Sequence, residues 1–161
     1  MIYIGIDPGC ASGAISIELN GVTRVTSMSK LTEHDIKDVF LNLKKENPNE
    51  EFFAVIEEIG AMPGDGRSSL AKFVGNWAFI RGVLSALNIP FERPRPQVWM
   101  RELKIGVRDK TLTTSQWKAQ LRAKAQHLYP DLKILADQGD AVLIMEYAKR
   151  LKNNDNRDTK E

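Results

Sequence analysis

Apolar and polar residues near the N-terminus of the chain follow the period of β-strands. Residues 1–6 form an apolar run, which predicts a buried strand, and residues 14–19 alternate between apolar and polar side chains. Pro and Gly residues mark a turn between these two segments. Asn20-Gly21 is typical of a tight hairpin turn and leads into a third segment at residues 22–28. The pattern therefore predicts three antiparallel strands.

Beyond these strands the apolar period is mostly that of helices. Thr32-Glu-His-Asp35 predicts the start of a helix that ends near Glu46, and a second apolar run at residues 52–56 predicts a strand. We expect further helices at residues 68–87, 97–103 and 113–128, a final helix that opens with Asp137, and a short strand at residues 89–91. Residues 153–161 are polar throughout, which predicts a disordered tail behind one domain of residues 1–152.

The composition is that of a globular protein. The chain has 161 residues, 42% of them hydrophobic and 27% charged, which is enough for one domain with a buried core. No apolar run approaches the roughly 18 residues of a membrane span, and no signal peptide is evident. Cys10 is the only cysteine, which excludes an intrachain disulfide and a zinc site with several thiolates. We therefore expect a cytoplasmic protein without a membrane partner.

Charge is distributed unevenly, although the formal net charge is only +2. Residues 93–124 contain nine basic residues and two acidic ones, whereas residues 46–58 contain five glutamates and no basic residue. This arrangement suits an enzyme that acts on a polyanion, because cations bind phosphates while carboxylates hold metal ions. A solvated loop and helix face is the alternative. The basic residues expected to contact the phosphates of such a polyanion are Arg95, Arg101, Lys104, Arg108, Lys110, Lys118 and Arg122.

Four acidic residues are placed to share one pocket. Asp7 follows the first predicted strand, and Glu57 follows the strand at residues 52–56. Asp137 and Asp140 are three residues apart at the start of the final helix, which places them on one face. Charges about 4 Å apart repel by about 4 kcal/mol at an effective dielectric constant near 20, so such a cluster needs cations. Hard oxygen ligands suit Mg²⁺ or Mn²⁺. The two aspartates of the final helix could instead be simple capping acids.

The order of these elements is that of the ribonuclease H-like fold, an α/β fold with a mixed five-stranded sheet flanked by helices. Within this superfamily the chain resembles the RuvC group of Holliday junction resolvases, especially their phage-borne relatives. The resemblance rests on motifs that occur in the family's order over most of the first 150 residues. These motifs are Ile4-Gly-Ile-Asp-Pro-Gly9, Ala54-Val-Ile-Glu57, Lys72-Phe-Val-Gly-Asn-Trp-Ala-Phe-Ile-Arg-Gly-Val83, Pro94-Arg-Pro-Gln-Val-Trp99 and Asp137-Gln-Gly-Asp-Ala-Val142.

The resemblance implies a crossover junction endodeoxyribonuclease that nicks two opposed strands of a four-way DNA junction symmetrically, in recombination and repair. Asp7, Glu57, Asp137 and Asp140 stand at the family's catalytic positions and would bind two Mg²⁺ ions, for which Mn²⁺ would substitute. One ion would activate a water molecule and the other would stabilise the leaving 3′ oxygen. Lys118 matches a family lysine near the scissile phosphate. The host would be a bacterial cell or a phage-infected one.

This chain departs from the family pattern in two places. Relatives usually carry a lysine within the segment that reads Val98-Trp-Met-Arg101 in this chain, so Arg101 would act in its place. Some family members insert an aromatic residue at the junction centre from the loop after Glu57. This chain has none there, which leaves Met62 as the only sizeable apolar candidate for contact with DNA.

Family enzymes are homodimers, as two equivalent cuts call for two sites related by a twofold axis. The helix over residues 70–87 would supply much of the interface, and burial of its apolar residues within the monomer is the alternative. Other functions also fit these motifs. A broader nuclease would cut flaps, forks or RNA paired with DNA, and a binding module would recognise junctions without cutting. Residues 4–9 also resemble a phosphate motif of sugar kinases and actin-like ATPases, but those proteins need two lobes.

Overall fold

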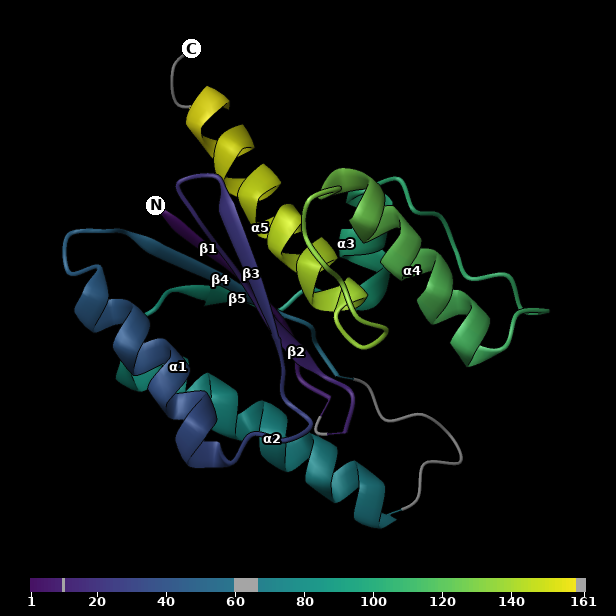
Figure 1. The fold of residues 1–161 in the computed structure, drawn as a ribbon, viewed down its shortest axis with the longest axis horizontal. Helices are drawn as coiled ribbons and strands as arrows, with labels where there is room; N and C mark the ends of the chain where they lie inside the picture. Colours follow the sequence, from purple (N-terminus) through teal and green to yellow (C-terminus); the bar gives the residue numbers. More distant parts are fainter. Residues whose placement is uncertain (10, 60–66, 159–161) are drawn as a thin grey trace.

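The structure is a computed structural model that describes residues 1–9, 11–59 and 67–158, and its centre is a five-stranded sheet (Figure 1). The strands lie in the order β3-β2-β1-β4-β5. The first three are antiparallel, and β4 and β5 run parallel to β1. The predicted ribonuclease H-like fold with a mixed sheet is therefore confirmed. The strand bounds are β1 Ile2–Asp7, β2 Ala14–Leu19, β3 Val22–Ser27, β4 Phe52–Ile56 and β5 Phe91–Glu92.

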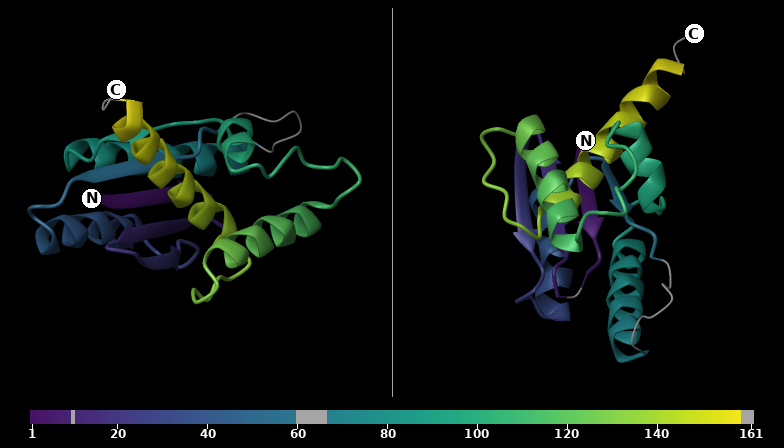
Figure 2. Two further views of the ribbon diagram at one scale, coloured as in Figure 1. Left: turned by 90° about the horizontal axis from the view of Figure 1, so that it is seen from above. Right: turned by 90° about the vertical axis from the view of Figure 1, so that its right-hand side faces the viewer.

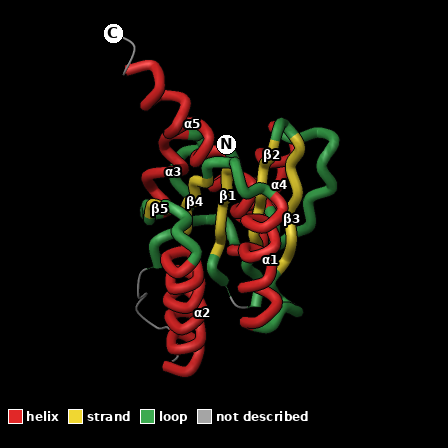
Figure 3. The backbone as a smooth tube through the Cα atoms, turned by 90° about the vertical axis from the view of Figure 1, so that its left-hand side faces the viewer, coloured by secondary structure: helices red, strands yellow, loops and turns green. Residues whose placement is uncertain are grey.

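Helices cover both faces of the sheet. One face carries α1 and α2, which lie alongside one another, and the other carries α3, α4 and α5 (Figures 1, 2 and 3). The first turns of α2 project beyond the sheet (Figure 3). None of the helices in the described part of the chain combines the length and the apolar composition of a membrane-spanning segment. The helix bounds are α1 Glu33–Glu46, α2 Arg67–Ala86, α3 Pro96–Glu102, α4 Thr114–Leu128 and α5 Gly139–Asp158.

Alternation along β1 explains how the sheet separates two hydrophobic cores. Ile2, Ile4 and Ile6 are fully buried in the core shared with α1 and α2. The residues between them point to the opposite face, where α5 crosses the strand. Gly5 permits this crossing, because a Cβ at Gly5 would collide with main-chain atoms of Ala141 and Met145. Asp7 continues the alternation and therefore faces α5.

Local capping signals in the sequence determine where two helices begin. Thr32 caps α1 through a hydrogen bond from the Asp35 N–H, and the Asp35 carboxylate accepts one from the Thr32 N–H. Thr113 and Gln116 form the same reciprocal pair at α4. Capping of this kind is worth about 1 kcal/mol per helix. It agrees with the predicted starts of both helices.

Three predicted boundaries differ from the structure by more than one residue. Asp137 lies in the turn before α5 rather than in its first turn, and α5 extends to Asp158 rather than ending in a disordered tail. No Gly or Pro interrupts this segment, and Lys and Arg favour a helix, which here continues through the less favourable Asn and Asp residues. The fifth strand begins at Phe91, after Asn88 in a left-handed conformation (φ 51°) and a hydrogen bond from Ile89 to Leu84 have ended α2.

The apolar residues of α2 are used largely within the monomer. Ile80, Val83 and Leu84 are buried in the core with β1 and β4, and Trp77 and Phe79 pack against it. Most of these side chains are therefore buried within the monomer, which was the alternative to their use in a dimer interface.

Candidate active site

Asp7 and Glu57 lie side by side at the carboxyl edge of the sheet. Asp7 is the last residue of β1, and Glu57 directly follows β4. Because Ile6 pairs with Ile56 in parallel register, and the Glu57 N–H donates to the Ile6 carbonyl (3.1 Å), the two acids are adjacent. Both belong to the odd-numbered residues that face α5. Asp7 is further held by a hydrogen bond from the Gly9 N–H to its Oδ1 (3.2 Å).

The third acid comes from the opposite end of the chain. Asp140 lies in the first turn of α5 and is buried. The close packing of α5 on Gly5 carries this turn to the end of β1, where Asp7 also lies. Asp7, Glu57 and Asp140 are called the acidic cluster below.

A lysine from α4 lies between two members of the acidic cluster. The Lys118 Nζ is 2.6 Å from Oδ2 of Asp140 and 3.4 Å from Oδ2 of Asp7. Gly139 allows α4 to come this close, since a Cβ at Gly139 would lie 2.8 Å from the Cα of Arg122 on α4. The site thus depends on two glycines, one under α5 and one under α4.

The pKa values of Asp7, Glu57 and Lys118 reflect burial and the charges around each group. Burial, together with the negative charges of Asp7 and Asp140, raises the pKa of Glu57 to about 8. Burial also raises the pKa of Asp7, against the opposing charge of Lys118. Partial burial lowers the pKa of Lys118, but the two aspartates outweigh it and hold the pKa above its ordinary value. The cluster therefore binds cations or protons in preference to standing fully charged.

Asp137 is close to this site but does not join the acidic cluster. It is half-buried and, among the described residues, makes no hydrogen bond or ion pair. It lines a pocket of about 400 Å³ that also includes Lys118 and Arg122. The other lining residues are Ser12, Thr114, Ser115, Ala119 and Ala136.

Most of the basic residues expected to contact DNA are exposed. Apart from half-buried Lys118, they lie directly before α3 (Arg95), on α3, on α4 and on the connection between these helices, which extends beyond the sheet (Figure 2). Arg108 is held by a hydrogen bond to the Leu112 carbonyl (2.8 Å). The exposed set is Arg95, Arg101, Lys104, Arg108, Lys110 and Arg122. Met62, the apolar residue expected to contact DNA, lies outside the described residues.

The donor set suits a hard divalent cation, although the described residues do not present three acidic, His or Cys side chains arranged as a metal site. The candidate ligands of the acidic cluster are carboxylate oxygens, which Mg²⁺ and Mn²⁺ prefer. The Lys118 ammonium lies between Asp7 and Asp140, in the position that a bound metal ion would take. Metal binding at these oxygens therefore requires Lys118 to move.

Trp99 is a contact of the site that the sequence did not reveal as one. Its side chain is fully buried. Its indole Nε1–H also donates a hydrogen bond to Oε1 of Glu57 (3.0 Å). The two residues are 42 positions apart, so only the folded arrangement reveals this pair.

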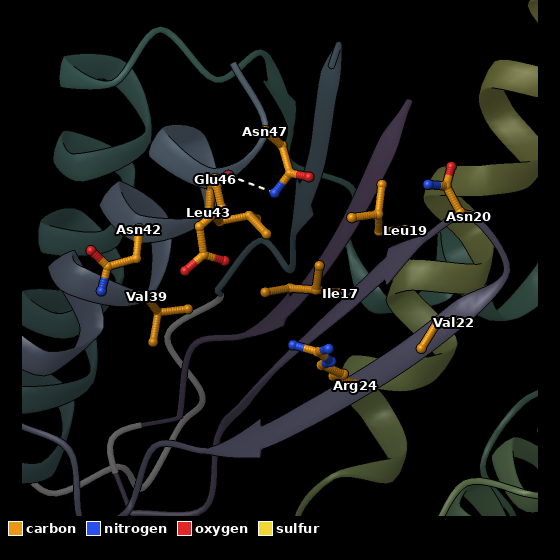
Figure 4. A pocket seen from close by; sticks show the side chains of 10 residues that line it. All are labelled: Ile17, Leu19, Asn20, Val22, Arg24, Val39, Asn42, Leu43, Glu46 and Asn47. Atoms are coloured by element: carbon orange, nitrogen blue, oxygen red, sulfur yellow. Dashed lines mark hydrogen bonds between the residues drawn. The ribbon is translucent and has the colours of Figure 1, made fainter. Parts of the chain in front are cut away.

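A second cavity lies away from the acidic cluster. It is a groove of about 460 Å³ between α1 and the strands β2 and β3 (Figure 4). Ile17, Leu19, Val39 and Leu43 supply its apolar lining. No member of the acidic cluster lines it, so the groove plays no part in the site described above.

The fold matches that of a known group of proteins. No family model and no curated protein sequence matches the chain. Two solved structures of RuvC from Thermus thermophilus are similar to it, each with 13% sequence identity over 94% of this chain. The structure in complex with a Holliday junction substrate has a TM-score of 0.63 and is covered over 96% of its length. The other has a TM-score of 0.57 and is covered over 97%.

Proposed function

We propose that this protein is a metal-dependent endonuclease of the RuvC type that resolves four-way DNA junctions by paired symmetric nicks. One observation carries the proposal: Asp7, Glu57 and Asp140 come together on a RuvC-like fold around a single cation, the Lys118 ammonium. Neighbouring acids with raised pKa values, as Asp7 and Glu57 have, are typical of a functional site rather than a structural one.

In this proposal the acidic cluster and Asp137 would hold two Mg²⁺ ions, or Mn²⁺ in their place. Bound there, the ions would supply an activated water and charge stabilisation at the leaving 3′ oxygen. Asp137 would join the cluster after a small movement of the turn before α5, where it lies free of other polar contacts among the described residues.

Lys118 would have two tasks in the same reaction. Without metal, its ammonium balances the charges of Asp7 and Asp140. With metal bound, the ammonium would move toward the neighbouring pocket that it lines with Arg122, where it would contact a phosphate of the bound strand. A lysine suits both tasks because its charge sits at the end of a flexible stem.

The exposed cations on α3, α4 and their connection would bind the DNA backbone. The helices α3 and α4 pack on the same face of the sheet as α5, which carries Asp140, and α4 supplies both Lys118 and Arg122. Phosphate contacts of this kind position DNA without reading its sequence. Their contribution decreases as salt rises, since each contact releases counterions.

Two symmetric cuts call for a homodimer, for which α2 offers a suitable face. Five small residues recur on its exposed side at alternating spacings of four and three. Open space surrounds Gly75 and Gly82: among the described residues, no atom beyond the helix's own backbone would lie within 4 Å of an added Cβ. A second helix could therefore approach closely along this face. The five residues are Ala71, Gly75, Ala78, Gly82 and Ser85, and they are called the α2 stripe below.

Comparison of substrates tests this function. Equal amounts of a labelled four-way junction, a flap, a linear duplex and an RNA–DNA hybrid are incubated with the protein in Mg²⁺ and in EDTA. We expect paired symmetric nicks in the four-way junction alone, and none in EDTA. Equal or faster cutting of the flap or the hybrid would replace the proposed substrate with a broader class of branched nucleic acids, while leaving the metal site in place.

A further inference from the structure

Trp99 connects the hydrophobic core to one member of the acidic cluster. Its side chain is fully buried and belongs to the same core as Val55 on β4 and Leu121 on α4. From this position the indole Nε1–H donates a 3.0 Å hydrogen bond to Oε1 of Glu57. The orientation of the acid is thereby tied to the packing of α3 against the sheet.

An indole N–H is well suited to holding a carboxylate in one orientation. It only donates, so the bond forms whether Glu57 is charged or protonated. A glutamate side chain otherwise loses up to about 2 kcal/mol of rotamer entropy when it is ordered. Among the described residues no second hydrogen bond or ion pair reaches the Glu57 side chain, so its Oε2 stays available as a ligand atom.

A buried tryptophan in this fold does not always form a hydrogen bond through its indole N–H. Trp77, also in this chain, buries its Nε1 without a hydrogen-bond partner among the described residues. The fold therefore accommodates an unpaired indole N–H elsewhere, although such groups usually find an acceptor. The acceptor of Trp99 is a carboxylate of the acidic cluster rather than a backbone carbonyl.

We propose that Trp99 is a positioning residue for Glu57: its hydrogen bond occupies one carboxylate oxygen and holds the other toward Asp7 and Asp140, which strengthens divalent metal binding. The inference rests on the metal-dependent function proposed above. Residues that support metal ligands in this way typically contribute roughly 10- to 100-fold to metal affinity. Trp99 would act through Glu57 and not touch the reacting atoms.

A double-mutant cycle on the full-length protein tests this role. Mn²⁺ alone is titrated into the wild type, Trp99→Phe, Glu57→Gln and the double variant, and binding is measured by calorimetry. We expect Trp99→Phe to weaken the binding roughly 10-fold or more. In the double variant Mn²⁺ should bind no more weakly than to Glu57→Gln alone, because the bond affects metal affinity only by positioning a carboxylate ligand, which the glutamine variant lacks.

A second replacement separates the hydrogen bond from packing. Trp99 is replaced by the tryptophan analogue in which sulfur takes the place of the ring N–H, which keeps the shape of the side chain. The same analogue at half-buried Trp117 is the matched control. We expect the analogue to weaken Mn²⁺ binding at position 99 and to leave it unchanged at position 117, with similar unfolding temperatures for both proteins.

Two results would overturn the inference while leaving the proposed function intact. One is wild-type Mn²⁺ affinity in the analogue at position 99. The other is a loss of Mn²⁺ affinity on adding Trp99→Phe to Glu57→Gln that equals the loss caused by Trp99→Phe in the wild type. If the wild type bound no Mn²⁺, or if Glu57→Gln bound it with full affinity, the metal site of the proposed function would itself be wrong, and the inference with it.

Discussion

At the scale of single residues, Lys118 balances the charge of two buried acids. Its Nζ lies within 3.4 Å of a carboxylate oxygen of both Asp7 and Asp140, and the acids themselves are buried. A buried charge pair contributes little net free energy to folding. Removal of one partner nevertheless destabilises the protein strongly, because the other charge is left buried without compensation. The lysine is therefore a stabilising residue as well as the proposed phosphate contact.

Lys118→Met should destabilise the metal-free protein. We expect the free energy of unfolding in EDTA to decrease by about 1–3 kcal/mol, less than for a fully buried pair because the lysine side chain is 34% exposed. Mg²⁺ should raise the unfolding temperature of the variant more than that of the wild type, since no ammonium has to be displaced. Exposed Lys133→Met is the control. Equal stability of Lys118→Met and the wild type would contradict this account.

The raised pKa of Glu57 predicts how stability depends on pH. The native protein keeps the Glu57 proton up to about pH 8, whereas the unfolded chain loses it near the ordinary pKa of 4.5. Between these values the native state binds more protons, so the stability contributed by this group decreases as pH rises. Glu57→Gln carries no such proton, and its amide oxygen still accepts the Trp99 N–H.

In EDTA, Glu57→Gln should therefore gain stability relative to the wild type as pH rises from about 5 to 8. One unit of pKa corresponds to about 1.4 kcal/mol, so we expect a relative gain of at least about 1 kcal/mol over this window. Denaturant unfolding at several pH values measures it. A difference that stays constant with pH would show that Glu57 is not protonated in the native state.

The residues of the site differ in how far the sequence could locate them. Asp7 and Glu57 follow apolar strands, so their adjacency could be derived from strand pairing. Lys118 is aligned by family resemblance, and the structure places it against Asp7 and Asp140, while its catalytic role stays a prediction. The pairing of Trp99 with Glu57 depends on tertiary packing, for which no local pattern exists.

At the scale of elements, glycines decide how closely helices pack around the site. A Cβ at Gly5 would meet main-chain atoms of α5, which cannot rotate away as a side chain can. Gly5→Ala should therefore lower the free energy of unfolding by about 1–3 kcal/mol or more, as overpacked cores do. Gly82→Ala in α2 is the matched control at concentrations where the protein is monomeric, since its Cβ would then enter open space and should stabilise the helix by about 0.5–1 kcal/mol. Chemical denaturation of both variants checks the pair; a stable Gly5→Ala would contradict the packing described.

The elements themselves could be predicted where capping and alternation coincide. The second and fourth strands begin and end as expected, and Thr32 and Thr113 cap their helices. The start of α5 is harder to place, because Asp137 and Asp140 both suit a first helical turn. The structure begins the helix at Gly139, where α4 packs against it. That contact is tertiary, so the three-residue spacing of the aspartates could not reveal it.

At the scale of the whole molecule, the α2 stripe predicts the assembly. Gly75→Arg places a long charged side chain in open space on the monomer and improves helix propensity, so the monomer should stay folded. In a dimer packed along the stripe the same side chain would separate the two helices. We expect this variant to be monomeric by light scattering and to nick four-way junctions without pairing the cuts. Exposed Asn42→Arg on α1 is the control, and an unchanged dimer in Gly75→Arg would place the interface elsewhere.

The most direct measurement of the central claim is junction cleavage by Asp7→Asn in Mg²⁺, with junction binding followed in parallel. Loss of a metal ligand should reduce the cleavage rate by more than the roughly 10- to 100-fold expected for residues that only support a ligand. Binding should be as tight as in the wild type or tighter, because one negative charge near the phosphates is removed. Cleavage of the four-way junction at the wild-type rate would contradict the proposal that the acidic cluster is the catalytic site.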